Sequence, residues 1–313
     1  MKINKETSSI DYCIYVMKDI INKIISFFIS LFKISDGQET DENPAQPDTQ
    51  DKEDGNETYS NNSYNNGSIF PENIENKETE TENPINTEMN NYGKLMVHLD
   101  NGHGKATPGK RSPSATTGKG YGSYTAQQLS IYEYEYNRLI VKLVDEKLIE
   151  LGFKTFIVTP EVEGDIGLTT RALRSNNMVR KNPGLKHIFI SAHVNACGDG
   201  KKWYTGSNGS YWCAYTSKGQ TGGDKLADCF YDAAEEVLKP FKKKIKTDLS
   251  DCDRDIEENF TVITKTTSPA VLVESLFMTN VDDVLFLKSD VGTKAIVDIY
   301  VKAIIKYCER YVK

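Results

Sequence analysis

Two histidines in this sequence stand at the ends of apolar, strand-like segments, and a glutamate interrupts a third such segment. His103 lies between two glycines after KLMVHLD, His193 lies near the end of HIFISAHVN, and Glu274 lies inside AVLVESLF. One histidine at a strand end is usually a structural group, but two of them with an acid in an apolar strand favour a metal site. Zinc in hydrolases takes three nitrogen or oxygen ligands and leaves a fourth position for water. The pattern therefore requires one further ligand, commonly a carboxylate.

Two glutamates in the segment IYEYEYNRL are candidates for the third ligand. Glu133 and Glu135 are two residues apart, so on a helix they point about 200° away from each other and cannot both face one site. Glu133 shares its helical stripe with apolar residues, whereas Glu135 shares its stripe with charged residues such as Arg138. We therefore expect Glu133 to face the site and Glu135 to face water.

If His103, Glu133 and His193 hold zinc, Glu274 becomes the natural proton shuttle. A bound zinc ion lowers the pKa of its water toward ~7, and a nearby carboxylate can take that proton and return it to a leaving amine. These four residues predict hydrolysis of an amide or an ester, and they do not specify which bond.

Five further polar residues have weaker assignments. Arg171 and Asn176 in GLTTRALRSNN either bind a substrate carboxylate or tie their helix to neighbouring loops, and Asn195 is a third candidate for substrate binding. His98 and His187 are less favoured as metal ligands, because one lies in the middle of a predicted strand and the other at the start of one.

The elements that must position these residues alternate between strands and helices. Strands are predicted over 94–100, 154–159, 187–195, 210–217, 260–266 and 270–278, and helices over 129–152, 167–182, 223–239 and 291–312. Near-continuous apolar strands between helices indicate one α/β domain, with a single, twisted, mostly parallel sheet flanked by helices on both faces. Ligands of such a sheet bind beyond the carboxyl ends of the strands, where both histidines fall.

The charge of the chain divides it into unlike parts. The net charge of -7 over 313 residues averages an acidic segment and a mildly basic one. Residues 36–93 carry 15 Asp and Glu against 2 Lys and Arg, with almost no aliphatic side chains, which predicts a disordered linker. Residues 94–313 carry 27 acidic against 31 basic residues and hold the predicted catalytic domain.

The first 35 residues contain an amphipathic segment over 14–34. Met17, Ile20, Ile24 and Phe28 fall on one helical face, and lysines interrupt the apolar run, so the segment matches neither a secretory signal nor a clean membrane span. A helix lying on a membrane surface, a helix packed on a partner and a poor membrane anchor remain open. Nucleic acid is not an expected partner, because the acidic linker repels phosphates and basic residues are dispersed outside KPFKKKIK.

The folded part, from about 94 to 311, resembles the zinc-dependent N-acetylmuramoyl-L-alanine amidases of the type-3 class. Bacteria and their phages use these enzymes to cut peptidoglycan. Four blocks match in order and spacing: LDNGHG, EYEYN, FISAHVNA and PAVLVESLFMTN. The resemblance implies that His103, Glu133 and His193 bind zinc and that Glu274 is catalytic. It also supplies the substrate, the amide between the lactyl group of N-acetylmuramic acid and the L-alanine of the stem peptide.

The sequence departs from the usual pattern of that family in three places. A Gly-rich insert over 105–130 separates His103 from Glu133, and we expect it to form a mobile rim or lid over the site. Ser275 stands where the family commonly has glycine after the catalytic glutamate. We recognise no wall-binding repeat beside the predicted domain.

Peptidoglycan is therefore the expected substrate, and a phage endolysin or a bacterial autolysin is the expected role. Two other classes remain open: a zinc metallopeptidase acting on other peptides, and a non-catalytic wall-binding module that keeps the fold. An amidase of this kind must reach the wall, so we expect synthesis in the cytoplasm and action beyond the inner membrane. The amphipathic segment and its long linker would then hold the enzyme at the membrane surface, and a protein partner stays unknown.

Overall fold

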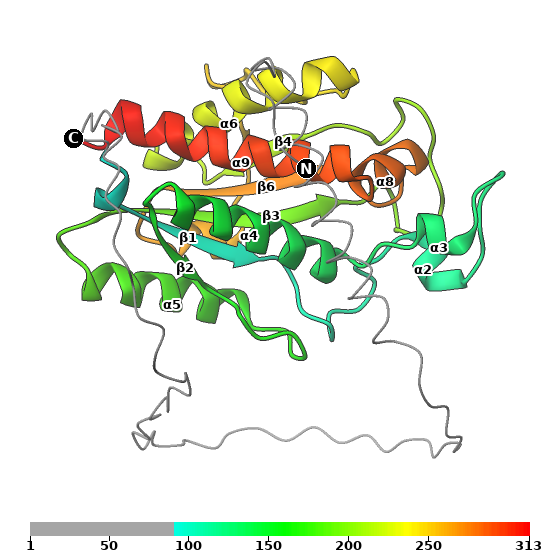
Figure 1. The fold of residues 1–313 in the computed structure, drawn as a ribbon, viewed down its shortest axis with the longest axis horizontal. Helices are drawn as coiled ribbons and strands as arrows, with labels where there is room; N and C mark the ends of the chain where they lie inside the picture. The colour runs from blue at the N-terminus through cyan, green and yellow to red at the C-terminus, as the bar shows by residue number, and fades with distance from the viewer. Residues whose placement is uncertain (1–90) are drawn as a thin grey trace, which may run out of the picture. The chain divides into compact units, whose positions relative to one another are not determined.

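Six strands form one mixed sheet, and helices cover both of its faces (Figure 1). The computed structural model describes residues 91–313. The strands are β1 (Leu95–Asn101), β2 (Lys154–Ile157), β3 (Lys186–Asn195), β4 (Cys213–Thr216), β5 (Ile256–Glu257) and β6 (Ala270–Phe277). Their order is β2-β1-β3-β6-β4-β5, and only the β4/β6 pair is antiparallel. The prediction of a mostly parallel sheet is confirmed.

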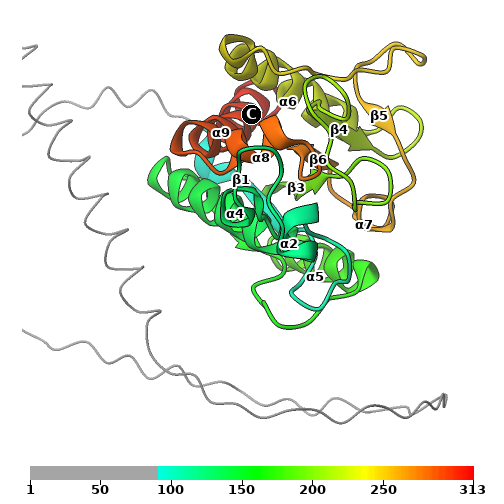
Figure 2. The same ribbon diagram turned by 90° about the vertical axis from the view of Figure 1, so that its right-hand side faces the viewer.

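The helices divide unequally between the two faces of the sheet. They are α2 (Pro113–Thr117), α3 (Ala126–Leu129), α4 (Glu133–Glu150), α5 (Leu168–Lys181), α6 (Gly222–Leu238), α7 (Thr261–Thr264), α8 (Val281–Leu287) and α9 (Asp290–Tyr311), with 3-10 turns at Tyr92–Lys94 and Lys239–Phe241. The long helices α4, α6 and α9 cover one face, and α5 and α7 lie together on the other (Figure 2). The predicted covering of both faces is confirmed.

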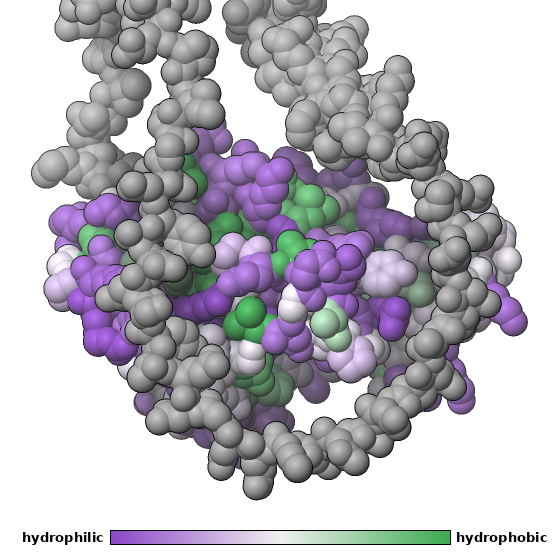
Figure 3. Space-filling view, turned by 90° about the horizontal axis from the view of Figure 1, so that it is seen from below, coloured by the Kyte–Doolittle hydropathy of each residue, from purple (hydrophilic) through white to green (hydrophobic). Residues whose placement is uncertain are grey.

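The alternation of side chains along β6 shows how both faces are filled. Val271 and Val273 belong to the large core cluster beneath α4, α6 and α9, whereas Leu272 packs with Phe189 and Ile263 on the α7 side. Burying a side chain of this size contributes about 1.5–3 kcal/mol, so both faces stabilise the sheet. The face seen from below in Figure 3 is mostly hydrophilic, with apolar side chains scattered over it. On α5, Leu173 is exposed.

The carboxyl ends of the three central strands meet at one edge. Asn101 at the end of β1 pairs with Ala192 of β3, and His193 of β3 pairs with Glu274 of β6. The register of β3 and β6 shifts just after this pair, between His193 and Asn195. The edge therefore gathers the residues that the sequence placed at strand ends.

Helix α4 begins at Glu133, four residues later than predicted. Leu129 belongs to the separate short helix α3, which Thr125 and Gln128 cap reciprocally. The break is fixed by long-range contacts, because the backbone N–H of Glu133 donates to Lys110 O at 3.0 Å. Gly152, with a φ of +89°, follows the end of α4 as predicted.

The strand predicted over 260–266 is wrong, because Thr261–Thr264 forms the helix α7. The β-branched run TVIT favours an extended strand by propensity. In the structure, Val262 and Ile263 are both buried in the smaller core cluster, which one helical turn allows and strand alternation does not. Packing therefore outweighs the local preference.

The amphipathic segment over 14–34 and almost all of the linker over 36–93 lie outside the described residues. Within the described part, Tyr92 at the end of that linker forms a 3-10 turn and stacks on Phe153, with ring centroids 4.2 Å apart. Among helices of residues 91–313, none is both long and apolar enough to cross a bilayer.

Candidate metal centre

His103 lies in a turn that its flanking glycines make possible. Its φ of +63° falls in the left-handed region, which residues other than glycine adopt at a cost and mostly at functional sites. A Cβ on Gly102 would lie 2.5 Å from the ring of His193, and a Cβ on Gly104 would overlap the backbone of Gly164. Gly102 thus lets the two histidines approach each other, with ring centroids 4.8 Å apart, and Gly104 lets the turn pack against the loop of Gly164.

Two side chains of α4 hold the backbone of this turn. Asn137 Nδ2 donates to Gly102 O at 3.0 Å, and Arg138 Nη1 donates to His103 O at 2.9 Å. Arg138 was expected to face water, so its role in positioning His103 was missed. The sequence offers one signal for this role: Arg138 directly follows Asn137, which lies on the buried face of the helix.

Three predicted ligands, from the turn after β1, the start of α4 and the end of β3, meet at this edge. Glu133 Oε1 lies 3.4 Å from His103 Nε2 and 3.0 Å from His193 Nδ1. The donor atoms of all three side chains lie within 4.8 Å of one another. Glu133 is only 1% exposed, whereas Glu135 is exposed and accepts a hydrogen bond from Tyr134. The structure therefore brings Glu133 into the group and leaves Glu135 out.

The three side chains shift one another's pKa values. Burial alone would raise the pKa of Glu133, but its hydrogen bonds with His103 and His193 outweigh burial and hold the pKa well below the usual range. Burial lowers the pKa of His103. Burial acts in the same direction on His193, but the hydrogen bond to Glu133 and the negative charges of Glu133, Glu274 and Asp100 together outweigh it and raise the pKa. The carboxylate is thus kept ionised, which is the form that binds a cation.

Glu274 stands beside this group on β6. It is the register partner of His193, so both side chains leave the sheet on the same side. Its Oε2 is buried and has no hydrogen-bond partner within residues 91–313. Burial, opposed by the charge of His193 and assisted by that of Glu133, raises the pKa of Glu274 to about 8. A carboxyl group of this kind can hold and release a proton near neutral pH.

The residues present fit a metal ion. Glu133 Oε2 is buried and, among the described residues, lacks a hydrogen-bond partner, which leaves one carboxylate oxygen of the group unsatisfied. Two imidazole nitrogens with one carboxylate oxygen form the donor set that catalytic zinc commonly takes. The group at His103, Glu133 and His193 could therefore bind a metal, and its chemistry suits zinc.

A second group of carboxylates makes structural hydrogen bonds. Asp224, Asp253 and Asp255 also lie close together. However, Asp224 caps the start of α6 with Thr221, and Asp255 accepts a hydrogen bond from Thr216. An all-oxygen set of this kind does not resemble a zinc centre.

Of the two roles that the sequence leaves open for Arg171, the structure shows the contacts of the structural one. Its side chain is 2% exposed, and Nη1 lies 2.9 Å from Asp100 Oδ1. The same nitrogen donates to Asn101 O at 2.6 Å. Asp100 also accepts from Ser191 of β3 at 2.7 Å. Arg171 therefore ties α5 to the end of β1, just before the turn of His103, and through Asp100 to β3.

Asn176 likewise makes the contacts of the structural role. Its Nδ2 donates to Lys265 O at 2.8 Å, and its Oδ1 accepts from the backbone N–H of Thr267 at 2.9 Å. These bonds tie α5 to the segment before β6. Asn195 is half-buried at the end of β3, where its Oδ1 accepts from the N–H of Ala196 at 2.8 Å, and its role with substrate stays a prediction.

The Gly-rich insert over 105–130 forms a rim at the same edge. It contains α2 and α3. The ammonium group of Lys288, which directly follows α8, donates hydrogen bonds to the carbonyl oxygens of Gln127 and Ser130, at 2.6 and 2.7 Å. Ser112 joins both ends of the rim, because its hydroxyl donates to Leu129 O at 2.8 Å. The predicted rim is therefore present, and its movement as a lid stays a prediction.

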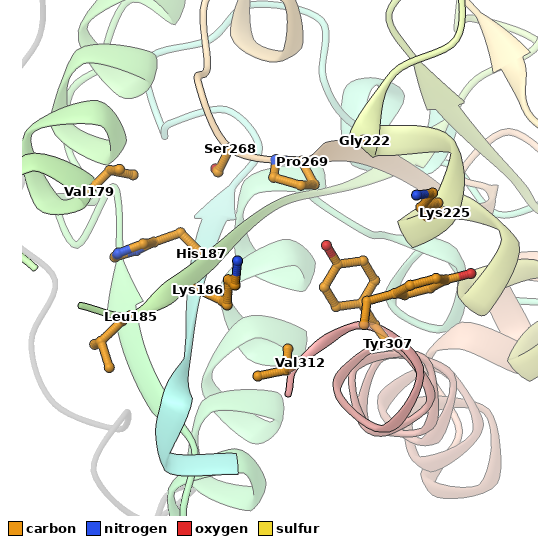
Figure 4. A pocket seen from close by; sticks show the side chains of 11 residues that line it. Val179, Leu185, Lys186, His187, Gly222, Lys225, Ser268, Pro269, Tyr307 and Val312 are labelled. Carbon is orange, nitrogen blue, oxygen red and sulfur yellow. The ribbon is translucent and has the colours of Figure 1, made fainter. Parts of the chain in front are cut away.

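His98 and His187 lie away from the candidate metal centre. They bond to each other through His98 Nε2 and His187 Nδ1 at 2.9 Å, and Ser175 and the carbonyl of Asn182 take the two remaining ring nitrogens. His187 lines a cavity of about 470 Å³ near the amino ends of β3 and β6, together with Lys186 (Figure 4). This cavity is at the opposite end of the strands, so both histidines are structural.

The buried His98 makes stability depend on pH. Burial, with the nearby His187, lowers the pKa of His98 to about 3. The unfolded chain therefore binds the proton more readily, and stability falls as pH decreases from about 6.5 toward 3. Between pH 7 and pH 5 we expect the free energy of unfolding to drop by up to about 2 kcal/mol through this residue. Urea titrations at both values should show a smaller drop for His98→Gln, and equal drops would contradict this assignment.

The mixed sheet, the group of two imidazoles and one carboxylate at its carboxyl edge, and the half-buried acid beside them define a hydrolase of α/β fold with a candidate metal centre. A family model, Amidase_3, described as N-acetylmuramoyl-L-alanine amidase, matches residues 97–306. The chain therefore belongs to the N-acetylmuramoyl-L-alanine amidase family.

Solved structures of amidases share this fold. The N-acetylmuramoyl-L-alanine amidase from Clostridium difficile 630 is 21% identical, with a TM-score of 0.51, over 70% of this chain and 99% of that one. The amidase Ami1 from Mycobacterium smegmatis is 18% identical, with a TM-score of 0.51, over 70% of this chain and 98% of that one. No curated protein matches in a comparison of sequences.

Proposed function

We propose that this chain is a zinc-dependent enzyme that hydrolyses the amide between N-acetylmuramic acid and L-alanine in peptidoglycan. The observation that carries the proposal is the group of His103, Glu133 and His193 beside the half-buried Glu274, in a chain of the amidase family. A non-catalytic wall-binding module has no use for a carboxyl group at this position with one oxygen buried and without a hydrogen-bond partner in the described fold. Such hydrolysis suits either a bacterial autolysin or a phage endolysin.

Each group of residues has a distinct role in the reaction. His103, Glu133 and His193 would hold zinc, which when bound supplies Lewis acidity to polarise water and the amide carbonyl. Glu274 takes a proton from water as the water oxygen attacks the carbonyl carbon. The C–N bond then breaks, and Glu274 returns its proton to the leaving nitrogen of L-alanine. Asn137 and Arg138 keep His103 in place by holding the carbonyl groups of its turn.

Digestion of peptidoglycan followed by mass spectrometry tests this function. We expect intact stem peptides with a free L-alanine amine, lost after chelation and restored by Zn²⁺. New peptide ends inside the stem would instead indicate a metallopeptidase. Walls that stay intact with zinc present would contradict the proposal.

We also propose that residues 14–34 hold the enzyme at a membrane surface, with the acidic linker allowing it to reach the wall beyond the inner membrane. The proposal is supported by the amphipathic pattern of this segment. Deleting residues 1–35 should move the protein from the membrane fraction to the soluble fraction. Unchanged fractionation would contradict membrane attachment.

A further inference from the structure

The rim insert presents aromatic rings on a hydrogen-bonded turn. Tyr121 and Tyr124 face each other across a backbone bridge, with N–H to O distances of 3.0 and 3.1 Å, and their side chains are 43% and 38% exposed. Gly122 supplies the positive φ of the turn, and a Cβ on Gly120 would lie 2.1 Å from Tyr124 O. The turn therefore depends on glycine at both positions for its backbone conformation. Large exposed aromatic groups at a fixed position are typical of contact surfaces.

One of these rings meets a tryptophan from another loop. The ring centroids of Tyr121 and Trp203 are 6.3 Å apart, and the ring planes are inclined by 49°. The loop of Trp203 is fixed just beyond β6, because Tyr204 bonds to the backbone of Thr279 at 2.9 Å and of Val281 at 3.0 Å. We call Tyr121 and Trp203 the rim pair. Two inclined aromatic planes on anchored loops form a surface that needs little ordering when a ligand binds.

The rim pair belongs to the same edge as the candidate metal centre. The insert leaves the turn of His103 and returns at Glu133, and the loop of Trp203 follows β3, which carries His193. In Figure 1, α2 and α3 of the insert lie beyond the arrowheads of β1 and β3. Tyr121 thus lies in the segment between His103 and Glu133, and Trp203 lies in the loop that follows the strand of His193.

We propose that the rim pair stacks against the sugar rings of the glycan strand, next to the sugar whose lactyl amide is cleaved. This inference rests on the proposed function and names the part of the substrate that lies outside the reacting bond. Axial C–H groups give one face of a pyranose ring an apolar surface that packs on aromatic planes, and successive sugars offer successive rings. The stem peptide is the competing occupant, and it lacks the apolar faces that successive pyranose rings offer.

Binding without hydrolysis tests the inference apart from the function. The full chain carrying Glu274→Gln is titrated with peptide-free oligosaccharides of alternating N-acetylglucosamine and N-acetylmuramic acid, and separately with free stem peptide, by calorimetry. We expect the oligosaccharides to bind and Tyr121→Ala to weaken their binding by about three- to tenfold, the scale of an aromatic contact. Tyr121→Phe should restore binding, because the aromatic plane is kept.

Tyr124→Ala is the matched control, since this ring is exposed on the same turn but has no ring contact with Trp203 among the described aromatic pairs. In kinetics, Tyr121→Ala should raise KM for fragments of several disaccharides, with kcat unchanged, and leave KM unchanged for a single muramoyl-peptide. Equal effects of Tyr121→Ala and Tyr124→Ala, absence of oligosaccharide binding, or a loss confined to stem peptide would each overturn the inference. A wild-type chain that binds oligosaccharides but cleaves nothing would overturn the proposed function alone.

Discussion

Glu274→Gln is expected to lower kcat for amide hydrolysis by at least about a thousandfold, within the range attributed to a general acid and base. Glutamine keeps the size of the side chain but cannot take a proton from water or return one to the leaving amine. The group is suited to this task because it lies beside His193 with Oε2 buried, and partial removal from water raises its pKa to about 8, near neutral pH. Release of L-alanine amine from purified peptidoglycan, measured at a fixed zinc concentration, gives the rate.

Stability and metal content separate lost chemistry from lost structure in this variant. Glu274 Oε2 has no hydrogen-bond partner within the described fold, so replacing the carboxyl by a neutral amide should leave the free energy of unfolding nearly unchanged. Zinc content should match the wild type, because Glu274 is outside the three-donor group. Retention of more than about a tenth of the wild-type kcat, against the range expected of a general acid and base, would assign the proton transfer to another residue.

The sequence predicts the candidate centre well because each of its residues leaves a local signal. Glycines beside His103 indicate close approach, and the structure shows that approach between the two histidine rings. The 3.6-residue period of a helix separates Glu133 from Glu135, and the burial of the two side chains follows it. Glu274 stands out because placing a carboxylate inside an apolar strand is energetically costly, which indicates a functional role.

Long-range partners leave no such signal. The sequence leaves open whether Arg171 binds substrate, because its partner Asp100 is 71 residues away along the chain. Arg138 faces water by helical period, yet its long side chain reaches back to the carbonyl of His103. Both arginines end at backbone or side-chain oxygens of the β1 edge, and tertiary packing alone decides this.

The elements that the sequence missed are short or lack periodicity. Helices α2, α3 and α8 span one or two turns, too little for a helical stripe to appear, and β5 has only two residues. In α7, the β-branched Val262 favours a strand, whereas the second core cluster buries it in a helical turn. The long elements that carry the candidate centre were predicted because their apolar patterns extend over many residues.

Glu133→Gln is expected to abolish the stabilisation of the protein by zinc, together with its hydrolytic activity. A ligand that binds only the folded state raises the free energy of unfolding by about 2.7 kcal/mol at a hundred times its dissociation constant. Glutamine keeps the shape of Glu133 and can still accept from the N–H of Val194, which Glu133 bonds at 3.2 Å. It loses the negative charge, however, that makes the group of two imidazoles a cation site.

Glu135→Gln provides a matched control on the same first turn of α4. Glu135 is exposed and bonds to Tyr134, so its neutral variant should keep the full zinc-dependent shift in thermal unfolding and the full activity. The shift is measured on full-length protein after chelation, with and without added Zn²⁺, so it does not depend on hydrolysis. Equal zinc shifts in both variants would remove Glu133 from the metal centre, and loss of the shift in Glu135→Gln alone would reverse the choice between the two glutamates. A shift lost only in Glu133→Gln would place the metal at the junction of β1, α4 and β3.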